Sequence, residues 1–147
     1  MTLKQRLTED MKNAMRNKDA ARLSAIRLIL AAIKQREIDE RVELDDAAVV
    51  AVIDKMQKQR RDSIAQFAAA RRDDLVAAES FELEVLQTYM PAQASDDEIE
   101  AAIAEAIRTT GAAGARDMGK VMAEIKPKLA GRADMSQVSA RIKAALV

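Results

Sequence analysis

The sequence has no cysteine, no histidine and no tryptophan, and only two phenylalanines and one tyrosine among its 147 residues. Without cysteine, no disulfide holds the fold and no thiol carries chemistry. Without histidine, the commonest general base and the commonest metal ligand are both missing. With both residue types absent, zinc and iron–sulfur sites are excluded. We therefore expect no metal and no cofactor.

Turn-forming residues are also scarce, with four glycines and two prolines in the whole chain. A protein with many strands would need more turn residues and more β-branched or aromatic runs. The residues that dominate instead are Ala, Leu, Met, Lys, Arg and Glu, which lose little entropy in a helix. The composition predicts an all-α protein.

The first part of the chain reads as about four helices, one of them long. Thr2 and Gln5 form a capping box at the first start, and Asp19 caps the second helix. We expect an exposed loop over residues 37–45, then a long helix from Asp45 or Asp46 to about residue 70. Pro91 stops the fourth helix, because proline disfavours helical geometry in the residue before it.

The remainder reads as three short helices. Ser95 to Glu98 forms a second capping box, a short helix covers about residues 118–126, and Asp134 caps the last helix. Pro127 is expected to weaken or kink the final turn of the middle helix. These patterns predict an N-terminal helical domain over residues 1–91 and a small helical tail domain over residues 92–147.

Sequence motifs for catalysis are missing. The chain contains neither a phosphate-binding P-loop nor a Gly-x-Gly-x-x-Gly fingerprint, and its serines have no histidine partner. The acidic pairs Asp45-Asp46, Asp73-Asp74 and Asp96-Asp97 stand at predicted helix starts, where the helix dipole stabilises them. We therefore predict no catalytic residue and no self-sufficient active site.

The start of the chain has charge within a few residues and no apolar signal region. No apolar run approaches the roughly 20 residues that a bilayer-spanning helix needs. We expect a cytoplasmic protein that does not enter a membrane.

Positive charge is uneven along the chain. Residues 1–90 hold 16 basic and 16 acidic side chains, whereas residues 115–147 hold seven basic and three acidic ones. Clustered lysine and arginine give affinity for phosphates, and a turn beside a helix start attracts anions. The tail is therefore either a phosphate-contacting surface or an ordinary solvated face. A second basic group on the long helix comprises Lys55, Lys58, Arg60 and Arg61, followed by Arg71 and Arg72. For this group a solvated face is favoured over a binding surface more strongly than for the tail.

Several short motifs are spread over nearly the whole chain: Arg22-Leu23-Ser24, Ile26-Arg27-Leu28, residues 58–64, Arg72-Asp73-Asp74-Leu75, Leu86 with Tyr89-Met90-Pro91, Met118-Gly119-Lys120-Val121-Met122 and Gly131-Arg132-Ala133-Asp134. On these motifs the chain resembles the YqeY family, whose members share the GatB/YqeY domain. The last two in tandem are the most specific. The resemblance implies a helical N-terminal domain and a tail similar to that of the B subunit of tRNA-dependent amidotransferase.

In that enzyme the tail contacts tRNA, so the resemblance makes Gly119, Lys120, Gly131 and Arg132 candidate tRNA contacts. Gly119 is equally open to a role in close helix packing. Lys126 and Lys128 join the candidates because of their charge. The expected partners are tRNA and either amidotransferase subunits or another translation-related protein.

Three functional hypotheses stay open. The first is a tRNA-binding or amidotransferase-associated accessory protein. The second is a carbon–nitrogen ligase that uses glutamine as amide donor together with partner subunits, and it rests on family association alone. The third is a helical protein–protein adaptor.

Overall fold

The computed structural model describes all 147 residues, Met1–Val147. It contains seven α-helices, one short 3-10 helix and no strand, which confirms the all-α prediction. The chain divides into two compact units, Met1–Met90 and Pro91–Val147. None of the helices is both long and apolar enough to cross a bilayer.

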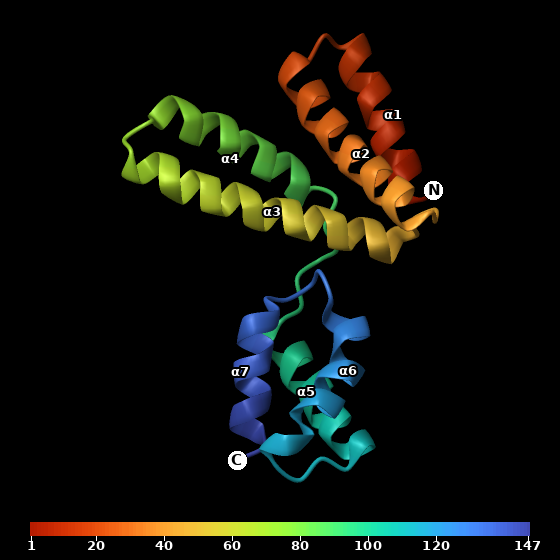
Figure 1. Cartoon of the computed structure of the whole chain (residues 1–147), viewed down its shortest axis with the longest axis vertical. Coiled ribbons are helices and arrows are strands. Elements are labelled where there is room, and N and C mark those ends of the chain that lie inside the picture. The colour runs from red at the N-terminus through yellow and green to blue at the C-terminus, as the bar shows by residue number, and fades with distance from the viewer. The chain divides into compact units, whose positions relative to one another are not determined.

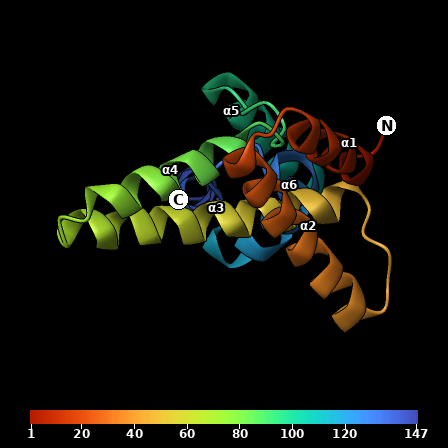
Figure 2. The ribbon, with the colours of Figure 1, turned by 90° about the horizontal axis from the view of Figure 1, so that it is seen from above.

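The first unit consists of two helical hairpins (Figure 1). The first hairpin pairs α1 (Leu3–Arg16) with α2 (Ala20–Glu40), and the second pairs α3 (Asp46–Ala69) with α4 (Asp73–Gln87). The turn between α3 and α4 lies well away from α1 and α2, as a second view confirms (Figure 2). The α3–α4 hairpin therefore packs on the first hairpin only near its base.

Aliphatic side chains fill the core of this unit. Ile26, Ile29 and Ile33 of α2 meet Ile53 of α3 and Leu86 of α4, each of them at most 2% exposed. The α2 residues are spaced three, four and seven apart, so they share one face of that helix. Burying a side chain of this size contributes about 1.5–3 kcal/mol.

The predicted helix starts are correct where a side chain provides the cap. Thr2 forms a complete capping box with Gln5, and Asp19, Asp45 and Ser95 each accept a hydrogen bond from the backbone N–H three residues later. Each cap satisfies a backbone donor that would otherwise lack a partner.

The predicted loop over residues 37–45 is wrong in its first half, because α2 continues through Glu40. Glu37 stabilises this last turn. Its Oε2 lies 2.7 Å from Lys4 Nζ and accepts a hydrogen bond from the Leu44 N–H at 2.8 Å. The helix then ends at Arg41, whose φ of 56° is left-handed.

The second unit is a three-helix bundle. It comprises α5 (Asp96–Thr110), the 3-10 turn η1 (Ala115–Asp117), α6 (Met118–Leu129) and α7 (Met135–Ala145). Its core is separate from the first and contains Ile103, Val121, Ile125 and Ile142, each at most 2% exposed.

Two predicted helix ends need correction. Helix α6 continues through Pro127 to Leu129, because Leu129 is buried and its packing holds the last turn in place. Helix α4 ends at Gln87, before Met90. There the chain turns so that Tyr89 is buried in the first core.

Helix α2 offers a matched test of this packing, since Ile33 is 1% exposed and Ile38 is 61% exposed. Replacing Ile33 with Ala should lower the free energy of unfolding by about 2–5 kcal/mol, because the deletion leaves a cavity. Replacing Ile38 with Ala should change it by less than about 0.5 kcal/mol. Urea denaturation followed by circular dichroism measures both. Equal losses in the two variants would contradict the assigned core.

Candidate nucleic-acid interface

Arg132 occupies the turn between α6 and α7 and holds that turn to the start of its own unit. Its Nη2 lies 2.7 Å from Glu98 Oε2, and its Nε donates to the Ala92 carbonyl at 3.0 Å. Its own carbonyl accepts a hydrogen bond from the Ala94 N–H at 2.8 Å. Gly131 precedes it with a φ of 74°. The guanidinium of this predicted RNA contact is therefore already engaged within the fold.

The carboxylate of Glu98 responds to this contact. The hydrogen bond from Arg132 is the main cause that lowers its pKa below the ordinary 4.5, and a backbone hydrogen bond at Ser95 adds to it. Because the charged form is favoured in the folded state, the ion pair stabilises the unit at neutral pH.

A second arginine of the tail is also paired. Arg141 Nη2 lies 2.6 Å from Asp96 Oδ1, and its Nη1 lies 3.3 Å from Glu100 Oε1. Acidic side chains in the first two turns of α5 therefore pair with Arg132 and Arg141, which are two of the seven basic side chains in residues 115–147. Charge counted by segment overstates the positive surface of the tail.

The start of α7 does not offer an anion site. The Asp134 carboxylate accepts from both the backbone N–H and the hydroxyl of Ser136, each at 2.9 Å. The sequence predicted that this helix start attracts an external anion. In the structure the Asp134 carboxylate already occupies that position.

Gly119 and Lys120 lie at the opposite end of α6 from the other four candidates. Lys120 is exposed, with Asp117 Oδ1 4.0 Å from its Nζ. Six residues separate Lys120 from Lys126, which is about 9 Å along the helix. Gly119 is exposed, and a Cβ built on it meets nothing within 4 Å. Close helix packing therefore does not explain this glycine.

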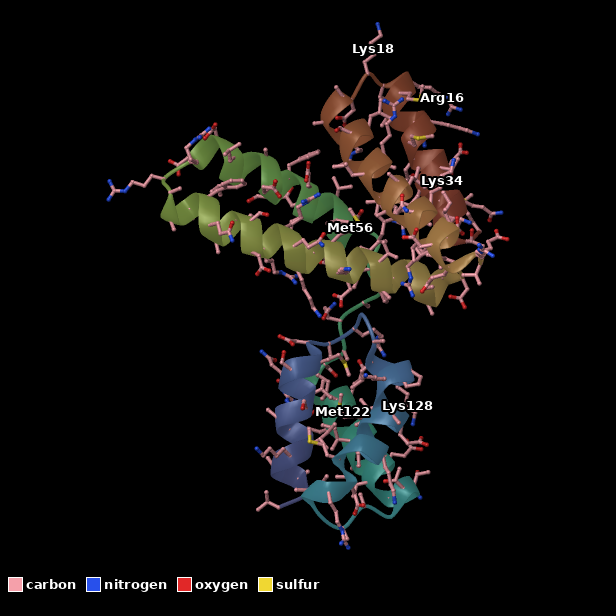
Figure 3. The ribbon with its side chains drawn as sticks, in the orientation of Figure 1. Arg16, Lys18, Lys34, Met56, Met122 and Lys128 are labelled. Carbon is pink, nitrogen blue, oxygen red and sulfur yellow. The ribbon has the colours of Figure 1, made fainter.

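Lys126 and Lys128 are the candidates whose charge stays available. Both are exposed in the last turn of α6, and neither has a carboxylate within 4 Å (Figure 3 labels Lys128). Two further exposed cations of this unit, Arg116 and Lys143, also lack an ion pair. The structure brings Lys126, Lys128, Gly131 and Arg132 together at the C-terminal end of α6.

The second basic group, on α3, does not form one patch. Arg60 turns inward, with its Nε 2.7 Å from Glu82 Oε2 and 3.5 Å from Glu79 Oε2 of α4. Both carboxylates are half-buried between the two helices. The position of Arg60 on the inward face of α3 was the available signal, because a buried cation needs a partner.

A polar cluster joins α1 to the end of α4. The Tyr89 hydroxyl donates to Asp10 Oδ2 at 2.5 Å, and the Arg6 guanidinium lies 4.8 Å from the centre of the Tyr89 ring. Burial is the main cause that raises the pKa of Tyr89, and the hydrogen bond to Asp10 adds to it. Next to this cluster lies a polar pocket of about 310 Å³.

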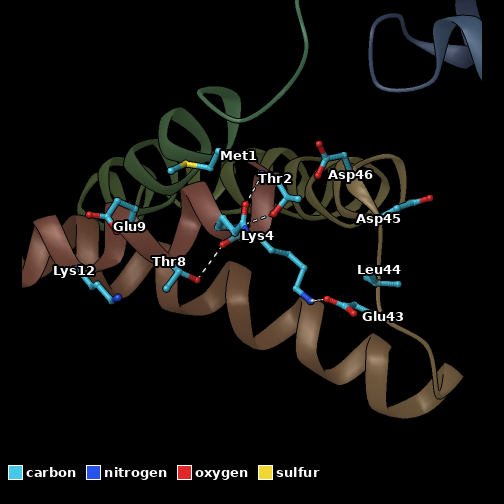
Figure 4. A pocket seen from close by; sticks show the side chains of 11 residues that line it. Met1, Thr2, Lys4, Thr8, Glu9, Lys12, Glu43, Leu44, Asp45 and Asp46 are labelled. Atoms are coloured by element: carbon cyan, nitrogen blue, oxygen red, sulfur yellow. Dashed lines mark hydrogen bonds and ion pairs between the residues drawn. The ribbon is translucent and has the colours of Figure 1, made fainter.

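An open groove of about 870 Å³ runs along the first turns of α1 and the segment that precedes α3 (Figure 4). Four of its six charged side chains serve the fold, and the other two, Glu9 and Lys12, have no ion pair. Glu43 pairs with Lys4 at 3.5 Å, Asp45 caps α3, and Asp46 accepts from the Leu3 N–H at 2.9 Å. No three acidic side chains converge anywhere in the structure in a way that would hold a metal ion.

A family model described as "Yqey-like protein" matches residues 4–146. The chain belongs to the YqeY-like family. The resemblance inferred from the tail motifs is thereby confirmed.

Curated relatives of this YqeY-like chain carry the name "Altered inheritance of mitochondria protein 41, mitochondrial". The one from Pyrenophora tritici-repentis is 35% identical over 94% of the chain and 77% of the relative. The one from Eremothecium gossypii is 39% identical over 81% of the chain and 67% of the relative. The one from Kluyveromyces lactis is 39% identical over 67% of the chain, and this match spans only 55% of the relative.

These names correct one prediction and leave others as they were. The relatives are called mitochondrial, which contradicts the cytoplasmic location expected for the YqeY-like chain. That expectation rested on missing features, and none of those absences distinguishes one aqueous compartment from another. The relatives' name mentions neither tRNA nor an amidotransferase, so both stay predictions.

The two glycines of the candidate interface should respond in opposite ways to alanine. Gly119→Ala should raise the free energy of unfolding by about 0.5–1 kcal/mol, because the site is open and alanine is the better helix former. Gly131→Ala should lower it by about 1–2 kcal/mol, because a φ of 74° is strained for a residue with a Cβ. Urea denaturation measures both, and a destabilising Gly119→Ala would restore the packing role.

The Glu98–Arg132 pair should make the second unit sensitive to acid. The pKa of Glu98 is lowered in the folded state, so its stabilisation is present above pH 4.5 and is lost as the pH falls through the folded value. The difference in melting temperature between the wild type and Glu98→Gln should shrink from pH 7 to pH 3. The control is Glu124→Gln, since Glu124 is exposed with no cation in ion-pair distance. A difference that does not change with pH would refute the assignment.

Proposed function

We propose that this YqeY-like chain is an RNA-binding accessory protein that acts beside glutamine-dependent tRNA amidation and has no active site of its own. The supporting observation is the C-terminal end of α6. Lys126 and Lys128 are exposed there without a carboxylate partner, next to a turn that Arg132 fixes in place.

The position of these lysines suits a phosphate contact. The dipole of α6 stabilises positive charge at its last turn, which supports the charged form without supplying a counter-ion. The Arg132 contacts hold the adjacent turn, so less ordering is needed when a ligand binds. Since residues two apart on a helix do not face each other, Lys126 and Lys128 offer two separate phosphate contacts on either side of a preformed turn.

The residue types at this site favour the RNA backbone over its bases. No aromatic side chain occurs after Tyr89, so stacking on unpaired bases has no platform in the second unit. Lysine contacts to phosphate position a protein on RNA without reading its sequence. The proposed tRNA contact therefore recognises folded RNA, and selectivity among tRNAs comes from a partner.

The test is tRNA binding by the full chain, measured by fluorescence anisotropy across a salt series. Each phosphate contact contributes roughly 0.7–0.9 to the slope of log affinity against log salt. The double variant Lys126→Gln, Lys128→Gln should therefore bind more weakly and lower the slope by about 1.4–1.8.

The matched control is the double variant Arg116→Gln, Lys143→Gln, which removes the same charge from exposed, unpaired sites elsewhere in this unit. It should retain the wild-type slope. No tRNA binding by the wild type at low salt rejects the proposal. Capture of a protein partner that survives ribonuclease treatment would favour the adaptor function instead.

A further inference from the structure

Charge in the first unit is segregated, although its total is zero. Residues 11–34 hold six basic side chains and one acidic side chain, a net charge of +5. Residues 35–54 hold two basic and seven acidic ones, a net charge of −5. The positive segment covers the end of α1, the turn at Lys18 and the first two thirds of α2.

Five of these six cations are free of carboxylates. Arg22 lies 3.6 Å from Asp19, but none of the others has an ion pair, and all are exposed. Arg16 has only the side-chain oxygen of Asn13 as a partner, at 2.8 Å. At the turn, Lys18 points away from both helices, as Figure 3 shows. We call this set the basic face; it comprises Lys12, Arg16, Lys18, Arg27 and Lys34.

The two helices present these cations on their outward surfaces. Lys12 and Arg16 are four residues apart, and Arg27 and Lys34 are seven apart, so each pair shares a side of its helix. The buried Leu7 lies opposite the α1 pair, whereas the α2 pair lies about a quarter of a turn around the helix from the buried Ile26. From Ala20 to Lys34 the face extends about 21 Å along α2.

Small side chains separate the cations on α2. Ser24 and Ala31 are exposed between them, so an extended polyanion can approach the helix closely. Two larger apolar side chains are also exposed here, since Met15 beside Arg16 is 50% exposed and Leu28 beside Arg27 is 43% exposed. Because a membrane-binding helix carries such residues next to its basic ones, anionic vesicles are the competing polyanion in the test below. The basic face also lacks an aromatic residue for stacking on bases. Its chemistry fits a regular line of phosphates.

We propose that the basic face binds the phosphate backbone of double-helical RNA, as a contact separate from the one at the end of α6. The choice of RNA as the polyanion rests on the proposed function. The acidic residues 35–54 lie beyond the far end of the basic face, so the attraction to RNA is greatest near the α1–α2 turn.

The experiment compares two triple variants of the full chain that remove equal charge. The first is Arg16→Gln, Arg27→Gln, Lys34→Gln on the basic face. The control is Lys55→Gln, Arg61→Gln, Arg71→Gln, at exposed α3–α4 hairpin sites without an ion pair. The probes are tRNA, a 20-base-pair RNA duplex and vesicles containing 30% phosphatidylserine. Circular dichroism and thermal melting verify folding.

The basic-face variant should bind tRNA and duplex more weakly and lower the salt slope by about 2–3, whereas the control keeps the wild-type slope. Equal losses in both variants overturn the inference, because they would reflect net charge alone. Wild-type binding to vesicles but not to RNA also overturns it.

Failure of this inference differs from failure of the proposed α6 contact. If the Lys126, Lys128 variant loses binding and the basic-face variant does not, the inference is rejected and the proposed function stands. If only the basic-face variant loses binding, the inference stands and the α6 contact is rejected.

Discussion

Burial of aliphatic side chains between helices holds both units together, because the chain has no disulfide and almost no aromatic residue to add to it. The two cores are separate, one around Ile26 and Ile53 and the other around Ile103 and Ile142. Gln57 is the only charged or amide side chain of the protein that is buried. A third of the residues are charged, and they must therefore lie at the surface, where their arrangement is free to serve function.

At that surface, the neighbours of a charge decide whether it is available. Arg132 and Arg141 have the residue type expected of phosphate contacts, but carboxylates of α5 engage both. Arg60 is engaged by α4 in the same way. A guanidinium held by a carboxylate helps to fix the position of the chain around it. An exposed lysine without a partner instead adds to the positive electrostatic potential of the surface. The functional proposals therefore rest on the unpaired cations.

The sequence predicted the parts of the fold that local chemistry determines. Caps at Thr2, Asp19 and Ser95 mark helix starts, and the helical spacing of isoleucines marks the buried faces. The last turn of α2 was missed because its support, Lys4, lies 33 residues away from Glu37. The engagement of Arg132 was missed for the same reason, since Glu98 lies 34 residues away. Contacts between distant residues leave no local pattern.

In the tail, counting charge by segment overstated the positive surface. In the first unit, counting charge over all 90 residues had the opposite effect, because it concealed a local excess of positive charge. A count over residues 1–90 gives zero net charge, yet the first hairpin carries five unpaired cations, while seven of the sixteen acids lie in residues 35–54, from the last turns of α2 into α3. Screening at physiological salt acts over about 8 Å, whereas the basic face alone extends about 21 Å. A polyanion at the α1–α2 turn is therefore affected mainly by the cations near it and only weakly by the distant acids. A neutral chain can in this way bind a strongly charged partner.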